Sequence, residues 1–152
     1  MILSQPIIAL TLLFALLPQA LAGNLIVHNK CHFNIWCAGA KNDRTATPAY
    51  KVRAGHKFTS PSPAHDDNVG AVLKCSLASD LSSPYQLEVA VLEGRSFIDL
   101  SALDGHPFLA YHRHAEVRKG GCILDCPPGV QTCEWPEAVD CATAGDAIMT
   151  LC

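Results

Sequence analysis

Two carboxylates in this sequence are spaced so that a β-hairpin would place them face to face. Glu93-Gly94 separates two strand-like runs, Tyr85–Leu92 and Arg95–Leu100. A two-residue turn at this point pairs Glu88 with Asp99 across the two strands, with Cβ atoms about 5 Å apart. Like charges directly opposite each other are destabilising, so this pair requires a cation, a proton or a ligand.

Two interpretations of the acidic pair remain open. It is either an exposed pair neutralised by Lys74, Arg95 or solvent, or a site that faces a carbohydrate or an ion. Glycoside hydrolysis requires two carboxylates about 5–5.5 Å apart for retention, or about 6.5–9.5 Å apart for inversion, on either side of the sugar. Residues paired directly across two strands leave little room for a sugar ring, so hydrolysis is the less favoured reading.

Other chemistry-bearing residues give weaker signals. His112 and His114 would share one face of a strand and could bind a divalent metal with His106 or Glu116. A solvated, pH-responsive edge is the favoured interpretation of this motif, and we expect neither a metal nor a cofactor. For Trp135, packing beneath disulfide loops is favoured over a surface platform for sugar stacking, and Trp36 is expected in the core.

The elements that must position these residues are short apolar runs separated by turn residues, a pattern typical of strands. Eight such runs in one unit predict a single all-β domain, an antiparallel β-sandwich. Residues 120–145 instead hold four cysteines and three prolines, and this segment is expected to be a disulfide-stapled loop region. The expected strands are Asn24–His28, Phe33–Gly39, Tyr50–Arg53, Val69–Ser76, Tyr85–Leu92, Arg95–Leu100, Pro107–Tyr111 and Ala147–Leu151.

Residues 1–22 have the features of a signal peptide. They contain no charged side chain, and an apolar run ends in Ala20-Leu21-Ala22, which predicts cleavage before Gly23. We therefore expect a secreted protein, extracellular or associated with the cell wall, whose mature domain is residues 23–152. The run is shorter than the roughly 20 residues needed to span a bilayer, so no membrane attachment is expected after cleavage.

The cysteine content and the charge agree with that location. Eight cysteines in a small secreted chain predict four disulfides rather than a metal site. A net charge of −3 without a basic cluster argues against nucleic acid and anionic lipid as partners, and a monomer is expected. The eight are Cys31, Cys37, Cys75, Cys122, Cys126, Cys133, Cys141 and Cys152.

Three patches of the chain, in order, resemble the thaumatin-like proteins. The opening Gly23–Trp36 is similar to the first strands of that family, with an Asn-x-Cys motif followed by an aliphatic residue and Trp. Gln86–Val89 and Phe97–Ser101 resemble its Glu strand and its Tyr-Ile-Asp-Ile-Ser segment, and the chain ends on Leu151-Cys152. Its size and the segment Cys126–Cys133 look closest to the small fungal branch, which includes the yeast-phase-specific (Bys) family of secreted proteins.

The resemblance implies a trimmed thaumatin-like sandwich in which Cys31 bonds to Cys152 and Cys133 to Cys141. The remaining cysteines would then pair among themselves, as Cys37–Cys75 and Cys122–Cys126. Larger members of the family line a cleft with one Arg, one Glu and three Asp, and some bind or slowly cleave β-1,3-glucan.

Within that cleft pattern, Glu88 and Asp99 match two of the acidic positions, and Lys74 falls near the Arg. Lysine lacks the planar guanidinium that contacts hydroxyls and carboxylates in pairs. Asp80 and Asp104 are the nearest candidates for the other acidic positions. Most of the cysteine-rich second domain that forms one wall of the cleft is missing from this chain.

These observations predict a secreted, non-enzymatic protein that binds cell-wall polysaccharide or an extracellular protein target. Glu88 and Asp99 would accept hydrogen bonds from the ligand, with Lys74 as the counter-charge. The alternatives are a weak endo-β-1,3-glucanase that uses the same two carboxylates, and a disulfide-rich effector or inhibitor that acts through the loops of residues 120–145.

Overall fold

The computed structural model describes residues 22–152, which form thirteen strands and no helix. The predicted leader, residues 1–22, lies outside the described residues except for Ala22. Within the described part of the chain, no helix is long and apolar enough to cross a membrane.

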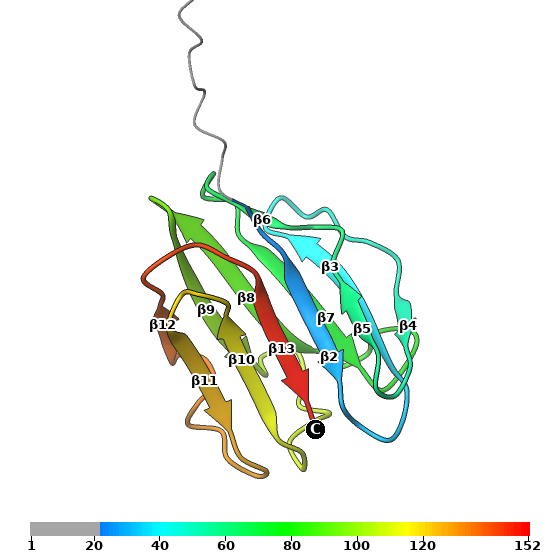
Figure 1. Cartoon of the computed structure of the whole chain (residues 1–152). Coiled ribbons are helices and arrows are strands. Elements are labelled where there is room, and N and C mark those ends of the chain that lie inside the picture. Colours follow the sequence, from blue (N-terminus) through cyan, green and yellow to red (C-terminus); the bar gives the residue numbers. More distant parts are fainter. Residues whose placement is uncertain (1–21) are drawn as a thin grey trace, which may run out of the picture.

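Two sheets lie face to face and make a sandwich (Figure 1). The five-stranded sheet has the order β11-β10-β13-β2-β5, and the six-stranded sheet has the order β12-β9-β8-β7-β3-β4. The first comprises β2 (Leu25–Asn29), β5 (Lys57–Thr59), β10 (Arg113–Val117), β11 (Cys122–Cys126) and β13 (Ala147–Leu151). The second comprises β3 (Ile35–Lys41), β4 (Tyr50–Val52), β7 (Ala71–Ser76), β8 (Tyr85–Leu92), β9 (Arg95–Ser101) and β12 (Ala138–Asp140). A small two-stranded sheet joins β1 (Ala22–Gly23) to β6 (Ala64–His65). The predicted all-β, antiparallel sandwich is confirmed.

The one parallel pairing among the described strands joins β2 to β13, which are far apart in the sequence. β2 and β13 lie side by side in the same direction, whereas all the other strand pairs are antiparallel. The Cys31–Cys152 disulfide links the chain just beyond these two strands, across a sequence separation of 121 residues. The predicted bond between Cys31 and Cys152 is thus confirmed.

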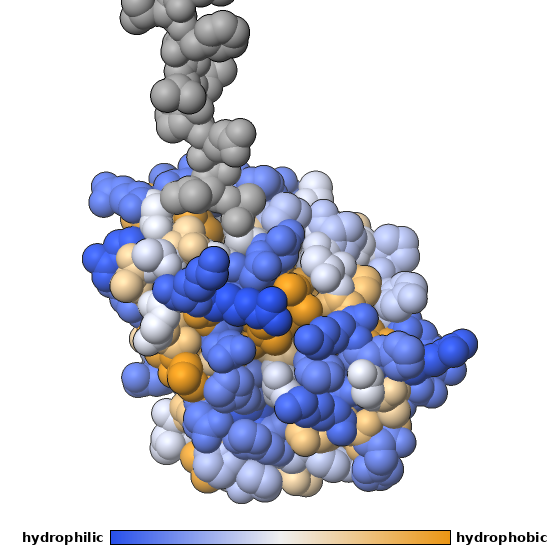
Figure 2. All heavy atoms as spheres, in the orientation of Figure 1, coloured by the Kyte–Doolittle hydropathy of each residue, from blue (hydrophilic) through white to orange (hydrophobic). Residues whose placement is uncertain are grey.

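Alternation along the strands builds the core between the two sheets. In β8, Leu87, Val89 and Val91 point inward and are at most 2% exposed, while Glu88 and Ala90 point outward. From the five-stranded sheet, Val27 and Met149 pack into the same core, and both are fully buried. The outer face of the five-stranded sheet is mostly hydrophilic (Figure 2).

The hairpin expected from Glu93-Gly94 is confirmed in register. Both turn residues have positive φ, 51° at Glu93 and 73° at Gly94, which is the conformation of a type I′ turn. This turn type matches the twist of the flanking strands, and it sets Glu88 directly opposite Asp99.

One strand prediction and one loop prediction were wrong between β9 and β13. Residues 107–111 form consecutive turns, in which Leu109 N donates to His106 O and Tyr111 N donates to Phe108 O. Phe108 is fully buried there, and a short apolar run does not by itself distinguish a strand from a buried turn. Residues 120–145 were expected to be loops, but they contain β11 and β12.

Two of the four expected disulfide pairings were also wrong. Cys37–Cys75 is formed as expected, between directly paired residues of β3 and β7. Cys122 and Cys126, however, stand at the two ends of the extended strand β11, which keeps their Cα atoms about 13 Å apart, too far for a bond. Each of them bonds instead to a cysteine that follows β11 in the sequence, which gives Cys122–Cys141 and Cys126–Cys133.

Candidate functional site

The acidic pair lies on the outer face of the six-stranded sheet. Glu88 of β8 is paired with Asp99 of β9, and Asp99 is paired on its other side with Ala138 of β12. Both carboxylates therefore project from the same side of neighbouring strands, away from the core. None of the ion pairs within residues 22–152 involves either carboxylate.

Asp99 is the unusual member of the pair. Its Oδ1 atom is buried and has no hydrogen-bond partner. Burial of the carboxyl, and then the neighbouring Glu88 carboxylate, raise the pKa of Asp99 to about 7. A group in this state can donate a hydrogen bond when protonated or accept one when ionised, so it is suited to a polar ligand.

A pocket of about 210 Å³ opens beside Asp99. Its polar lining includes Asn42 and the two carboxylates, and its aromatic lining is Phe97 and Trp135. Trp135 is 52% exposed, so the favoured expectation that it packs beneath the disulfide loops was wrong. Trp36 is also only partly buried, and the ammonium of Lys51 lies 5.6 Å from its ring centroid.

The backbone holds Trp135 at the rim of this pocket. Trp135 N donates a hydrogen bond of 2.7 Å to Leu100 O, at the residue after Asp99. The preceding residue, Glu134, turns its side chain inward and is 5% exposed. Consecutive residues thus supply an exposed aromatic ring and a buried anchor.

The anchor is a buried polar network around Glu134. Its Oε1 atom accepts hydrogen bonds from the Tyr85 hydroxyl at 2.7 Å and from Arg113 Nε at 3.2 Å. His106 Nε2 lies 2.9 Å from the same oxygen, and Gln131 Nε2 donates to His106 Nδ1 at 2.8 Å. All of these hydrogen bonds can form together when His106 carries its hydrogen on Nε2, because Nε2 then donates to Glu134 and Nδ1 accepts from Gln131.

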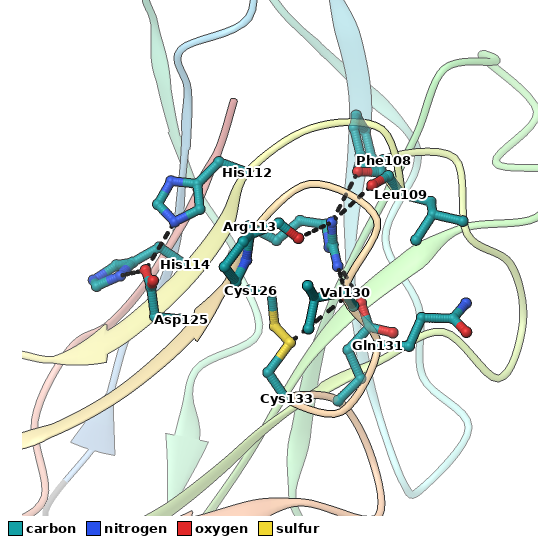
Figure 3. The surroundings of a disulfide bond; sticks show 12 residues. Phe108, Leu109, His112, Arg113, His114, Asp125, Cys126, Val130, Gln131 and Cys133 are labelled. Atoms are coloured by element: carbon teal, nitrogen blue, oxygen red, sulfur yellow. Dashed lines mark hydrogen bonds and ion pairs between the residues drawn. A yellow bond between two sulfur atoms is a disulfide. The ribbon is translucent and has the colours of Figure 1, made fainter.

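Arg113 connects this network to the surrounding loops (Figure 3). Its side chain is fully buried, and its Nη1 donates to the carbonyls of Leu109 and Tyr111 at 3.0 and 2.6 Å. Its Nη2 donates to the carbonyl of Val130, which lies within the loop closed by the Cys126–Cys133 disulfide. The carboxylate and the several carbonyl partners offset the free-energy cost of burying this charged guanidinium.

Sequence reasoning missed the roles of Arg113 and Glu134. Arg113, Ala115 and Val117 share the inward face of β10, so the alternation from Ala115 and Val117 could have located the buried arginine. An arginine at an inward position masks the hydrophobic pattern by which strands are recognised. Nothing local marks Glu134, because its three partners come from distant parts of the chain.

Lys74 lies near the acidic pair but neutralises a different residue. Its Nζ forms a 2.9 Å ion pair with Asp104 Oδ2, and Arg95 pairs with Asp140 at 2.6 Å. Lys74, Asp104 and Glu88 line a second hollow of about 400 Å³, in which Glu88 forms a wall shared with the first pocket. Asp80, the other acidic candidate, is exposed and lines neither hollow.

The histidine motif lies on the other sheet. His112 Nε2 and His114 Nδ1 contact the same oxygen of Asp125, at 2.8 and 3.1 Å (Figure 3). Hydrogen bonds from His114 and His112 lower the pKa of Asp125. Among residues 22–152, no group of three or more His, Cys, Asp or Glu residues is arranged to hold a metal ion.

Comparisons with known proteins agree with this architecture. An antigenic thaumatin-like protein of Arthroderma benhamiae is 28% identical over 133 residues, which cover 84% of this chain and 68% of the relative. The crystal structure of the protein elicitor MoHrip2 from Magnaporthe oryzae is similar in fold, with a TM-score of 0.75 and 22% identity over 86% of this chain and 99% of that one. The thaumatin-like xylanase inhibitor TLXI has a TM-score of 0.61 and 18% identity over 84% and 98% of the two chains.

The sequence also matches a family model over nearly its whole length. The match spans residues 12–152 and is to the family described as the Blastomyces yeast-phase-specific protein, Bys1. The resemblance read from the opening strand, the hairpin and the final cysteine is confirmed. The chain belongs to the Bys1 family and has a thaumatin-like fold.

Proposed function

We propose that this protein is a secreted, non-catalytic binding protein that recognises cell-wall polysaccharide in the pocket between Trp135 and the Glu88–Asp99 pair. The observation that carries the proposal is the half-buried Asp99 carboxyl, which lines the same pocket as the exposed Trp135 ring and forms no ion pair within residues 22–152. A sugar presents hydroxyl groups around its edge and an apolar C–H face, so it can satisfy both features at once.

The geometry favours binding over hydrolysis. Glu88 and Asp99 project from the same face of adjacent strands, so both form the floor of the pocket. A glycosidase needs its two carboxylates on either side of the scissile bond. The weak endo-β-1,3-glucanase alternative would require the sugar to lie between two directly paired residues.

Secretion is supported by the four disulfides and by the leader-like residues 1–22. Disulfides form and persist outside the cytosol, and every cysteine of the chain is paired. Together with the Cys31–Cys152 closure, these bonds suit a small domain that must remain folded without chaperones.

The proposal is tested by sedimentation of the oxidised mature protein with insoluble β-1,3-glucan, with chitin and cellulose as controls. We expect selective pelleting with β-1,3-glucan and no release of reducing sugar. Release of sugar would support the glucanase instead, and failure to pellet would contradict glucan binding. The Glu88→Gln/Asp99→Asn double variant should remain in the supernatant.

A second candidate function is binding to an extracellular protein through residues 120–145. Ile123 is 59% exposed and Val130 is 37% exposed in this segment, so apolar side chains are available for a partner. The two structural neighbours are named as an elicitor and a xylanase inhibitor, which fits action on another molecule. Exchange of Ile123 and Val130 for Ser would abolish such binding and leave glucan pelleting intact.

A further inference from the structure

Basic and acidic residues are segregated along this chain. Residues 30–57 hold six Lys and Arg residues and a single acidic residue, Asp43, although the whole chain has a net charge of −3. The remaining thirteen acidic residues all follow residue 65. The six basic residues are Lys30, Lys41, Arg44, Lys51, Arg53 and Lys57.

The topology turns this segregation into a charge asymmetry across the sandwich. β4 and β5, the edge strands of the two sheets on one side, carry Lys51 and Lys57. β11 and β12, the edge strands on the opposite side, carry Asp125 and Asp140 (Figure 1). Lys51, Arg53 and Lys57 therefore lie together at one edge of the molecule, and the expectation from the sequence that there is no basic cluster was wrong.

The basic edge contains a hollow of about 390 Å³ lined by β4, β5 and the turn between them. Lys51, Arg53, His56 and Lys57 line it. None of these four forms an ion pair with another residue in the described range 22–152. The positive charges of Arg53 and Lys57 are thus available to a ligand, while the Lys51 ammonium lies 5.6 Å from the centroid of the Trp36 ring.

An aromatic ring stands beside these cations. Tyr50 also lines the hollow, is 57% exposed, and stacks on Phe58 with ring centroids 5.1 Å apart and planes inclined by 13°. The Phe58 ring of β5 thus supports one face of the Tyr50 ring of β4. The hollow therefore combines a fixed aromatic face with uncompensated cations.

The turn that carries Arg53 and His56 is fastened to β2. Gly55 N donates to Asn29 O at 2.7 Å, and Asn29 N donates to His56 O at 3.0 Å. The buried Asn29 side chain also donates to Val52 O at 3.1 Å. Gly55 has a φ of 76°, a conformation that glycine adopts without strain. Arg53 is consequently presented on an ordered turn, which reduces the entropy lost on binding.

We propose that this basic hollow binds an acidic polysaccharide, a chain of sugars bearing carboxylate or sulfate groups. The Arg53 guanidinium can hold either group through two parallel hydrogen bonds, with Lys51 and Lys57 as additional point charges. The Tyr50 ring provides a surface for the C–H face of a sugar between two charged groups. This site is separate from the Trp135 pocket and does not depend on it.

The acidic remainder of the molecule disfavours the other anionic partners. A membrane surface or a long nucleic acid extends beyond a single edge and would bring further phosphates toward the acidic strands. A polysaccharide segment can follow the narrow basic edge between β4 and β5. Tyr50 is, moreover, a single aromatic side chain, whereas single-stranded nucleic acids usually stack on several.

The test is the affinity of the oxidised mature protein for polygalacturonate and for dextran sulfate at low salt, with neutral dextran as the control. We expect binding to an anionic polymer, no binding to dextran, and loss of affinity at high salt. Preference for polygalacturonate identifies the carboxylate as the recognised group, and preference for dextran sulfate identifies the sulfate. Arg53→Gln/Lys57→Gln should weaken binding about tenfold, since two charge contacts are lost.

A control double variant distinguishes binding at this hollow from a general response to the net charge of the protein. Arg118→Gln/Lys119→Gln removes the same charge from an exposed turn between β10 and β11, and should change the affinity less than twofold. Tyr50→Leu should weaken binding several-fold without changing its salt dependence. Unfolding midpoints establish that each variant is folded, and Lys51→Gln is the substitute if the double variant is not.

Three results would overturn the proposal. The first is no binding to either anionic polymer. The second is an equal loss of affinity in the two double variants, which would show a response to net charge alone. The third is equally tight, Arg53-dependent binding to single-stranded DNA or to phosphatidylserine vesicles, which would replace the polysaccharide with one of those partners.

Discussion

Glu88 and Asp99 face each other directly across the β8–β9 hairpin, and no cation pairs with either carboxylate among residues 22–152. The arrangement disfavours the ionised form of Asp99, whose buried Oδ1 lacks a partner and whose pKa rises to about 7. Sites that bind or transform ligands often hold such groups, because evolution retains an unfavourable residue where it serves a function.

Asp99 should make the folded protein less stable as the pH rises. Its pKa is about 7 when folded against 3.8 for the ordinary group, so the folded state keeps a proton that the unfolded chain has lost. The stabilisation that comes from this retained proton has its full value below about pH 4. It decreases up to about pH 7 and does not change further above that pH. Asp99→Asn should therefore remove the slope and, at pH 8, stabilise the protein by roughly 0.5–1 kcal/mol relative to wild type.

Urea unfolding at pH 5 and pH 8 measures this effect. Asp80→Asn is the matched control, because Asp80 is exposed and hydrogen bonds from Ser82 lower its pKa. That control should not gain stability at pH 8. A wild-type protein that becomes more stable than Asp99→Asn between pH 5 and pH 8 would contradict the assignment.

The pKa of Asp99 should respond to Glu88 and much less to Lys74. Glu88→Gln removes the neighbouring negative charge, so the pKa of Asp99 should fall while remaining above its ordinary value, since burial is the larger cause. Lys74 is occupied by Asp104, so Lys74→Gln should produce a smaller change. Carboxyl-carbon NMR titration of the variants checks this; a larger shift from Lys74→Gln would mean that lysine is the true counter-charge.

Loss of the Glu134 carboxylate should destabilise the whole domain. Glu134→Gln leaves the Arg113 guanidinium, which is 0% exposed, without its counter-charge. Breaking a buried pair on one side costs roughly 3–5 kcal/mol. Glu137→Gln, an exposed substitution three residues later, is the control for urea unfolding and should be nearly neutral. Equal unfolding free energies for the two variants would show that the network contributes nothing.

The disulfides should differ in their contribution to stability. Cys31–Cys152 spans 121 residues and Cys126–Cys133 spans 7. The chain-entropy relation gives about 5 kcal/mol for the longer loop and about 2.5 kcal/mol for the shorter one. Paired Cys→Ser variants, compared by thermal and urea unfolding, should follow that order. Peptide mapping of the oxidised protein should recover Cys122–Cys141, and recovery of Cys133–Cys141 would contradict the structure.

The parts of the fold governed by local rules could be predicted from the sequence. The Glu93-Gly94 turn and the alternation of Leu87, Val89 and Val91 determine the hairpin and its register without reference to the rest of the chain. The acidic pair follows directly from that register. Cys31–Cys152 was inferred from a resemblance, and the parallel pairing of β2 with β13 explains it.

The rest depends on contacts between distant segments. The position of Trp135 is determined by Glu134, whose partners Tyr85, His106 and Arg113 are 21 to 49 residues away. The wrong disulfide pairings have the same origin, because β11 was not recognised as a strand. An extended β11 separates Cys122 from Cys126, whereas a loop could have brought them together.

The most direct test of the proposed polysaccharide site uses Trp135 as its own reporter. The chain has two tryptophans, so Trp36→Phe leaves Trp135 as the only one, and its fluorescence is followed during titration with a soluble β-1,3-glucan oligosaccharide. We expect a saturable blue shift, with affinity reduced at least tenfold when Glu88→Gln and Asp99→Asn are added, since charged hydrogen-bond acceptors are lost. An emission spectrum that does not respond to the sugar, or a response that the two substitutions leave unchanged, would contradict the site.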